Sequence, residues 1–207
     1  MSLQIKDKSE LAKDMDTAFI LHMDHGFNVS TFTARVVSSS LSDMISAVVA
    51  AISSLKGPLH GGANTAVMNM LLEIGSINNL ENWVDKALQE KRKIMGFGHR
   101  VYKTFDPRAK YLKQMSQEWG KKTNNTKWYE MSEKLESLML SKKGLNPNVD
   151  FYSASTYYSM GFSPDIYTPI FAVARMVGWC SHVIEQLNDN RIIRPKSNYI
   201  GEFNKQI

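Results

Sequence analysis

The sequence predicts an all-α protein, and two observations support that prediction. Apolar residues recur about every 3.6 positions along most of the 207-residue chain, whereas the alternating patterns of β-strands are scarce. Two helix starts are also visible, because Asp106 precedes Pro107 and Thr168 precedes Pro169, each a capping side chain followed by a proline suited to the first helical turn. We therefore expect amphipathic helices joined by short breaks.

The expected helices follow one another along the whole chain. In order, they span residues 10–22, 43–55, 59–74, 80–93, from 107 past 119, about 128–143, and 168 to about 188. Ser42 is the expected N-cap of the second helix, and the Gly57-Pro58 pair is its stop signal. Asn79 is available to cap the fourth.

The breaks between these helices contain most of the unusual polar residues. They lie at residues 25–30, 57–64, 96–108 and 146–150. The stretch from about 61 to 158 also carries most of the lysine-rich surface, which predicts a separate lobe. The sequence has no internal repeat and no Gly/Ser-rich linker.

Composition excludes several classes of protein. With 43% apolar and 22% charged residues, the chain is typical of a globular protein and not of collagen or a disordered segment. One cysteine, Cys180, allows no internal disulfide and no cysteine-based zinc site, which favours a reducing compartment such as the cytoplasm. There is no apolar run long enough for a transmembrane helix, and the first residues do not resemble a secretory signal.

A metal site is the first interpretation to weigh for the five histidines. His22 and His25 are three positions apart, but this spacing has no meaning if the helix ends between them. There is no HExxH motif and no second close pair, whereas zinc needs three or four ligands in fixed geometry. We therefore expect no metal, with His22 as a buried helix residue.

Two other histidines lie in glycine-rich breaks. His60 precedes Gly61-Gly62, where a ligand can approach the backbone and a helix start favours a negative partner. His99 follows a Gly-Phe-Gly sequence and has Arg108 nearby, which favours a tight loop that meets an anion. A glycine hinge and an exposed basic loop are the structural alternatives.

Three charged residues remain ambiguous from sequence. Asp150 is either a helix N-cap or a catalytic base. Arg175 lies within an apolar helix face and needs a partner, either a ligand carboxylate or a structural acid, because an unpaired buried charge is costly. Arg194 follows the last helix, where it is either a ligand residue or part of a basic tail.

Taken together, six segments resemble the C-terminal part of the citrate synthase family. They occur in the family's order as DHGFNVSTF at 24–32, GPLHGGAN at 57–64, GFGHRVYKTFDPR at 96–108, NVDFYS at 148–153, PIFAVARMVGW at 169–179 and RPKSNYIG at 194–201. One such motif is weak evidence, but six in order are specific, and the resemblance runs from about residue 10 onward.

The resemblance implies a two-lobed helical fold. Residues 1–60 and 159–207 correspond to parts of the large domain, and residues 61–158 to the small domain. Members of the family are longer, and the N-terminal helices of their large domain have no counterpart here. We therefore expect a truncated chain whose activity and association differ from those of its parent.

The resemblance also implies a reaction, the condensation of acetyl-CoA with oxaloacetate followed by hydrolysis of citryl-CoA to citrate and CoA. The catalytic residues it implies are His60, His99 and Asp150. Oxaloacetate would be held by His25, Arg108 and Arg175, and by Arg194 from a partner subunit. CoA would lie against Met95, Gly96, Phe97 and Gly98, with Lys103 near a phosphate. These residue types suit the chemistry, because a dianionic substrate accounts for several cations in one site.

The expected protein is thus a transferase of the tricarboxylic acid cycle, cytoplasmic and homodimeric, with no cofactor besides its acyl-CoA substrate. Three alternatives stay open. A 2-methylcitrate synthase would use the same residues on propionyl-CoA, since a methyl group is worth only about 1–3 kcal/mol in a pocket. A truncated chain can also be a catalytically incompetent helical fragment. A nucleic-acid-binding module fits the net charge of +5 but lacks a basic motif.

Overall fold

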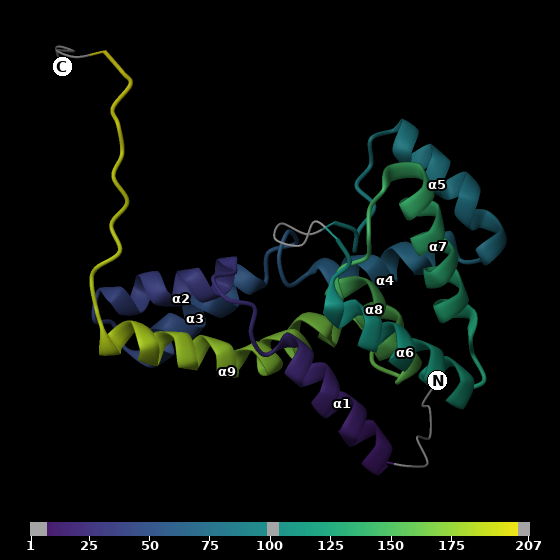
Figure 1. Cartoon of the computed structure of the whole chain (residues 1–207), viewed down its shortest axis with the longest axis horizontal. Helices are drawn as coiled ribbons and strands as arrows, with labels where there is room; N and C mark the ends of the chain where they lie inside the picture. The colour runs from purple at the N-terminus through teal and green to yellow at the C-terminus, as the bar shows by residue number, and fades with distance from the viewer. Residues whose placement is uncertain (1–7, 99–103, 203–207) are drawn as a thin grey trace.

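The computed structural model describes residues 8–98 and 104–202, which confirm the all-α prediction. Within these ranges there is no β-strand, and one isolated bridge joins Phe97 to Pro147. The helices, shown in Figure 1, are α1 Lys8–His22, α2 Val29–Ser39, α3 Met44–Leu55, α4 Ala63–Ile74, α5 Leu80–Gln89, α6 Pro107–Lys122, α7 Lys127–Lys143, α8 Val149–Ser159 and α9 Tyr167–Asn188, with 3-10 turns at Ile77–Asn79 and Pro164–Ile166.

Two helices were missed from the sequence. Helix α2 is rich in β-branched residues and serines, which weakens its helical pattern, and it is started by the Asn28 side chain, which accepts a hydrogen bond from the Thr31 N–H at 3.2 Å. Helix α8 is buried on nearly every side and therefore shows no polar face in its sequence. Both begin inside segments that we expected to be breaks.

Several predicted boundaries were wrong. Asp43, not Ser42, caps α3, since its carboxylate accepts the Ser46 N–H at 2.9 Å. Helix α4 begins at Ala63 rather than at residue 59, because residues 57–62 form successive turns. Helix α5 ends at Gln89, before Lys91, which has a left-handed φ of 55°.

The predicted caps Asn79 and Thr168 also serve other purposes. Asn79 makes no side-chain cap bond, and its amide donates to the Ile74 carbonyl at 3.0 Å. Helix α9 starts one residue before Thr168, whose hydroxyl donates to the carbonyl of Gly61 at 3.2 Å. Thr168 thereby joins α9 to the turn that precedes α4.

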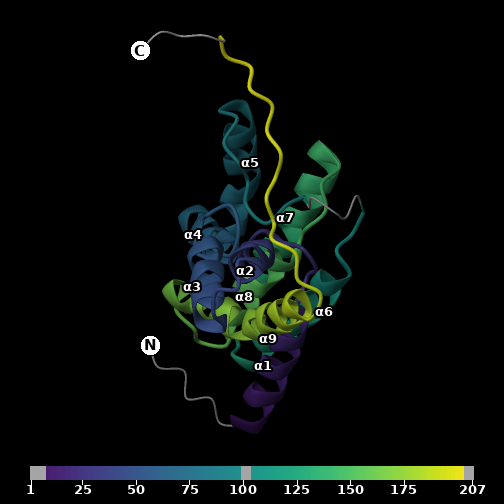
Figure 2. The ribbon, with the colours of Figure 1, turned by 90° about the vertical axis from the view of Figure 1, so that its left-hand side faces the viewer.

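The helices form two apolar clusters. Helices α2, α3 and α9 pack on one another around Leu55, Phe171, Trp179 and Val183, and they lie side by side in Figures 1 and 2. A larger cluster is formed by helices α4, α5, α6, α7 and α8, with contributions from α1 and from Tyr167. The division into residues 1–60, 61–158 and 159–207 remains our proposal for the domain boundaries.

The chain leaves the helices after α9. Residues 190–202 have no regular secondary structure and extend away from the helices (Figure 1). The start of this tail is anchored to α2, where Asn190 and Ile193 hydrogen-bond to Ser39. In the part of the chain that the structure describes, no helix has the length and apolarity needed to span a bilayer.

Candidate active site

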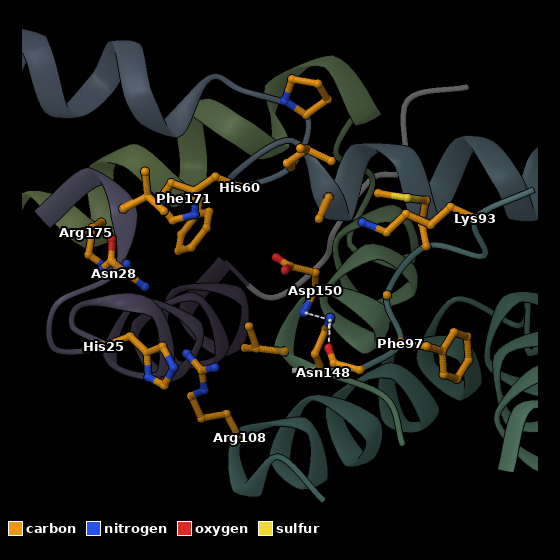
Figure 3. A pocket seen from close by; sticks show the side chains of 18 of the residues that line it. His25, Asn28, His60, Lys93, Phe97, Arg108, Asn148, Asp150, Phe171 and Arg175 are labelled. Atoms are coloured by element: carbon orange, nitrogen blue, oxygen red, sulfur yellow. Dashed lines mark hydrogen bonds between the residues drawn. The ribbon is translucent and has the colours of Figure 1, made fainter. Parts of the chain in front are cut away.

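A cavity of about 1060 Å³ collects most of the residues singled out in the sequence (Figure 3). Its walls come from the loop before α2, the turn before α4, the segment before α6, and helices α6, α8 and α9. The predicted residues that line it are His25, His60, Met95, Gly96, Phe97, Gly98, Arg108, Asp150 and Arg175. Residues from both apolar clusters therefore meet at one cavity.

Three predicted site residues are not among them. His99 and Lys103 lie outside the described residues. Arg194 belongs to the exposed tail, and its guanidinium donates only a 3.4 Å hydrogen bond to the Pro195 carbonyl among the contacts within described residues. A role for Arg194 in the cavity of this same chain is thus not supported by its position.

The Asp150 carboxylate is held in the cavity without a capping role. Helix α8 is capped by Asn148, whose side-chain oxygen accepts the Asp150 N–H at 3.0 Å, so the cap interpretation of Asp150 was wrong. Its Oδ1 is shielded from solvent and has no hydrogen-bond partner. Burial raises the pKa of Asp150 to about 6, against the opposing effect of Arg108 and Arg175. A carboxylate of this kind is suited to act as a base near neutral pH.

His60 faces the cavity from the turn before α4 and is anchored from behind. Its Nε2 lies 2.8 Å from the Ser30 hydroxyl, which donates to Asn28 Oδ1 at 2.8 Å and accepts from the Trp179 indole at 3.1 Å. Because the Ser30 proton goes to Asn28, Nε2 of His60 is the donor in this arrangement. Burial, and then Arg175, lower the pKa of His60 to about 4, so the ring is neutral at pH 7.

Two guanidinium groups reach the same cavity. Arg108 donates from Nε and a terminal nitrogen to Asp106, at 3.0 and 2.8 Å, and Asp106 also caps α6 as predicted. Arg175 is buried, and its Nε donates to the His22 carbonyl at 2.6 Å. Burial, together with repulsion from Arg108, lowers the pKa of Arg175 to about 10. Two cations in one cavity favour an anionic ligand.

His22 is a structural residue at this site, as expected for a buried helix position. It is the last residue of α1, so the His22–His25 pair does not share a helix face. Its Nδ1 donates to the Ala18 carbonyl at 2.7 Å, and burial lowers its pKa to about 4. Among the described residues, no three His, Cys, Asp or Glu side chains are grouped as a metal site.

Residues 95–98 are hydrogen-bonded to the segment that leads into α8. The Asn148 N–H donates to Gly96 O at 2.9 Å, and the Asn148 side chain donates to Gly98 O at 3.1 Å. Gly96 has a φ of +85°, and a β-carbon there would overlap Phe151 and Val67. The same asparagine thus holds both this segment and the helix that carries Asp150.

Sequence reasoning missed other residues of the cavity wall. Lys93 lines the cavity and points into it in Figure 3, but it was placed at the end of a predicted helix. Asn28 and Phe171 also line it. The nearest sequence signal for Lys93 was its place just before the Gly96-Phe97-Gly98 break.

The family model described as "Citrate synthase, C-terminal domain" matches residues 2–196 of this chain. The chain belongs to the citrate synthase family. Its similarity to named relatives is high: it is 58% identical over 184 residues to citrate synthase 2 of Bacillus subtilis, covering 89% of this chain and 50% of the relative. It is also 42% identical over 203 residues to 2-methylcitrate synthase 1 of Corynebacterium glutamicum, covering 98% and 53%.

Solved structures of the family agree with this fold. Citrate synthase from Thermotoga maritima has a TM-score of 0.89 and 46% identity, covering 99% of this chain and 57% of that one. A ternary complex of citrate synthase from Thermoplasma acidophilum with carboxymethyl coenzyme A and oxaloacetate also has a TM-score of 0.89, with 40% identity and coverage of 96% and 54%. The chain thus spans about half the length of the relatives it matches.

Proposed function

We propose that this chain is the catalytic part of a citrate synthase, which condenses acetyl-CoA with oxaloacetate and hydrolyses the resulting thioester. The observation that carries the proposal is the cavity in which the desolvated Asp150 carboxylate meets Arg108 and Arg175. A base of raised pKa beside two cations suits proton removal from one substrate and binding of an anionic second substrate.

Oxaloacetate is the proposed anion. Its two carboxylates need bidentate donors, which Arg108 and Arg175 supply, and His25 lines the same cavity. We further propose a homodimer in which Arg194 of one subunit reaches the substrate of the other. The tail after α9 supports this, because it extends away from the helices (Figure 1) and Arg194 does not line the cavity of its own chain.

The proposed reaction begins when Asp150 takes a proton from the acetyl methyl group, while His60 donates a hydrogen bond to the thioester oxygen. His60 can donate from Nδ1 only if Nε2 becomes an acceptor, so the Ser30 proton must turn from Asn28 toward His60. The enol carbon then attacks the ketone carbon of oxaloacetate, and His99 protonates the ketone oxygen. Water finally cleaves the thioester, giving citrate and CoA.

Acetyl-CoA is proposed to lie along residues 95–98, with Lys103 near a CoA phosphate and Lys93 as a further cation in the cavity wall. The Thermoplasma acidophilum enzyme, at 40% identity, binds carboxymethyl coenzyme A and oxaloacetate together, which supports this pair of ligands. The steps need no metal or redox cofactor. We place the enzyme in the cytoplasm and in the tricarboxylic acid cycle.

A 2-methylcitrate synthase is the second candidate, because such relatives match at 42% and 43% identity. Release of CoA from acetyl-CoA and propionyl-CoA, each with oxaloacetate, distinguishes the two. We expect faster turnover of acetyl-CoA, and a clear preference for propionyl-CoA would overturn that assignment. The assay should be run on this chain and on the longest natural chain that contains it. Activity of the shorter chain tests whether it is a catalytically incompetent fragment.

A further inference from the structure

The turn that presents His25 to the cavity is held from outside by helix α9. Three positions on one side of α9, Arg175, Gly178 and His182, meet the chain between His22 and Asp24. Arg175 donates to the His22 carbonyl, as described above. Gly178 allows the backbone to approach, because a β-carbon at that position would overlap the carbonyl oxygen of Met23.

The Asp24 carboxylate binds both the backbone after His25 and the side chain of His182. Its Oδ2 accepts the Gly26 N–H at 3.2 Å, and Gly26 has a left-handed φ of 54°. Its Oδ1 lies 3.2 Å from Nε2 of His182. One carboxylate therefore shapes the turn and also ties it to α9.

Arg35 fixes which nitrogen of His182 is the donor. A terminal nitrogen of Arg35 lies 3.1 Å from Nδ1 of His182, and arginine has only donors, so Nδ1 must accept and Nε2 must donate to Asp24. The Arg35 guanidinium also lies over the Phe27 ring, 4.7 Å from its centroid, and His182 meets the same ring edge-on at 5.7 Å. His182 thus contacts Asp24 and Phe27, the two ends of the turn 24–27, and Arg35 contacts Phe27.

We propose that His182 is a positioning residue that sets the orientation of His25 toward oxaloacetate, an inference that rests on the proposed function. His182 is not among the residues that line the catalytic cavity; it lines a separate cavity of about 400 Å³ together with Asp24 and Gly178. Its effect on substrate binding must therefore pass through the turn. A small shift of a substrate-binding group is enough to weaken binding and turnover.

The test compares His182→Leu with His182→Gln in the longest chain that carries this sequence. Leucine removes both hydrogen bonds, and we expect the KM for oxaloacetate to rise about tenfold while the KM for acetyl-CoA stays within about twofold. Glutamine keeps a donor for Asp24 and an acceptor for Arg35, so we expect it to restore most of the loss. The control is Tyr129→Phe, which removes a 2.7 Å hydrogen bond to Glu133 on α7, away from the cavity, and should leave both KM values unchanged.

A double-mutant cycle tests whether His182 acts through His25. In a His25→Ala background, His182→Leu should change the KM for oxaloacetate by less than about twofold, because the group it positions is gone. An undiminished effect in that background, or equal increases for both substrates, would overturn the inference.

Imidazole nitrogen-15 spectra separate this inference from the proposed function. The His25 signals, assigned with His25→Ala, should move in His182→Leu and return in His182→Gln, whether or not the protein turns over substrate. If the unchanged protein neither binds oxaloacetate nor releases CoA, the proposed function fails, and the spectra still decide the positioning of His25. Unmoved His25 signals in His182→Leu would overturn the inference.

Discussion

The side chain of Asn148 accepts the backbone N–H of Asp150 at 3.0 Å, so the helix is capped by one residue and the carboxylate two positions later is left for another role. The Asp150 side chain then lies in the first turn of α8, where the helix dipole favours a negative charge, yet burial outweighs that effect and raises its pKa to about 6.

Replacing Asp150 with asparagine should abolish most of the turnover, because the amide cannot accept the methyl proton. We expect kcat to fall about 10²–10⁴-fold with a much smaller change in the KM for oxaloacetate. Steady-state release of CoA measures both. Asn148→Ala shows what loss of the cap costs, about 0.5–2 kcal/mol of stability, although it also removes the hydrogen bond to Gly98 O. Retained activity in Asp150→Asn would exclude the proposed base.

The pH profile should report the same carboxylate. Asp150 must be ionised to act as a base, so kcat/KM should fall as the pH drops through about 6, the raised pKa of this group. Arg108 lowers that pKa, so Arg108→Leu should move the acid limb to higher pH. Rates between pH 4.5 and 9 check both points, and an acid limb near pH 4 in the unchanged enzyme would contradict them.

Stability should depend on pH in the opposite sense from that of a typical surface carboxylate. The folded pKa of Asp150 is about 6 against an ordinary value of 3.8, so its ionisation opposes folding, and stability is lost as the pH rises through this window. The free energy of unfolding of Asp150→Asn, relative to that of wild type, should therefore be about 1–3 kcal/mol higher at pH 8 than at pH 4. This range follows from about 1.4 kcal/mol per pKa unit. Urea unfolding at the two pH values measures this difference, and a constant difference would refute it.

Replacing Arg108 should affect one substrate more than the other. Arg108→Leu removes a proposed partner of an oxaloacetate carboxylate, so the KM for oxaloacetate should rise far more than that for acetyl-CoA. It also removes two hydrogen bonds from the buried Asp106 carboxylate, so a lower melting temperature is expected as well. Equal effects on both substrates would indicate that the residue is only structural.

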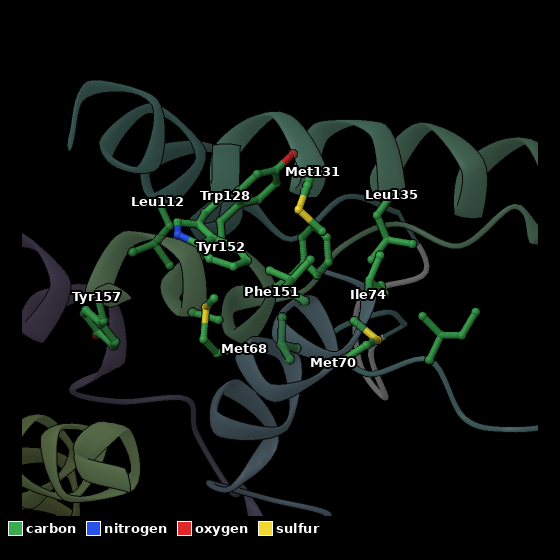
Figure 4. Close-up of a cluster of buried hydrophobic side chains, with 14 of the residues drawn as sticks. Met68, Met70, Ile74, Leu112, Trp128, Met131, Leu135, Phe151, Tyr152 and Tyr157 are labelled. Carbon is green, nitrogen blue, oxygen red and sulfur yellow. The ribbon is translucent and has the colours of Figure 1, made fainter. Parts of the chain in front are cut away.

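How far the sequence predicted the fold can be seen by comparing α6 with α8. Helix α6 has one apolar face and a clear Asp-Pro start, so both its period and its beginning were visible. Helix α8 places Phe151, Tyr152 and Tyr157 in the core along with its serines (Figure 4). A helix surrounded by packing has no polar face to reveal its period, so sequence periodicity alone does not find it.

The site was predicted from motifs rather than from local chemistry. Local reasoning left Asp150 open between a cap and a base because Asn148, the true cap, was not considered. The partner of Arg175 was equally hidden, since a backbone carbonyl 153 residues away leaves no trace in sequence. Lys93 was missed because its position depends on where α5 ends, and helix ends are set by tertiary contacts as well as by propensity.

Helices α2, α3 and α9 carry exposed apolar residues. Helix α3 buries Ala47 and Ala51 on one side, yet Ile45 and Val49 on the other side are 76% and 57% exposed. On α9, Val173 and Val177 are 60% and 56% exposed. Apolar surface of this extent on neighbouring helices is typical of an interface.

We therefore expect the chain to self-associate, in the proposed homodimer or in another pairing through these helices. Light scattering at micromolar concentration should give a mass above the 23.5 kDa of one chain. Ile45→Glu with Val49→Glu should shift the protein toward the monomer, because each buried charge would be costly at an apolar interface. Leu140→Glu, at a residue 52% exposed on α7, is the matched control and should leave the mass unchanged. A folded monomer in the unchanged protein would show that these faces need no partner.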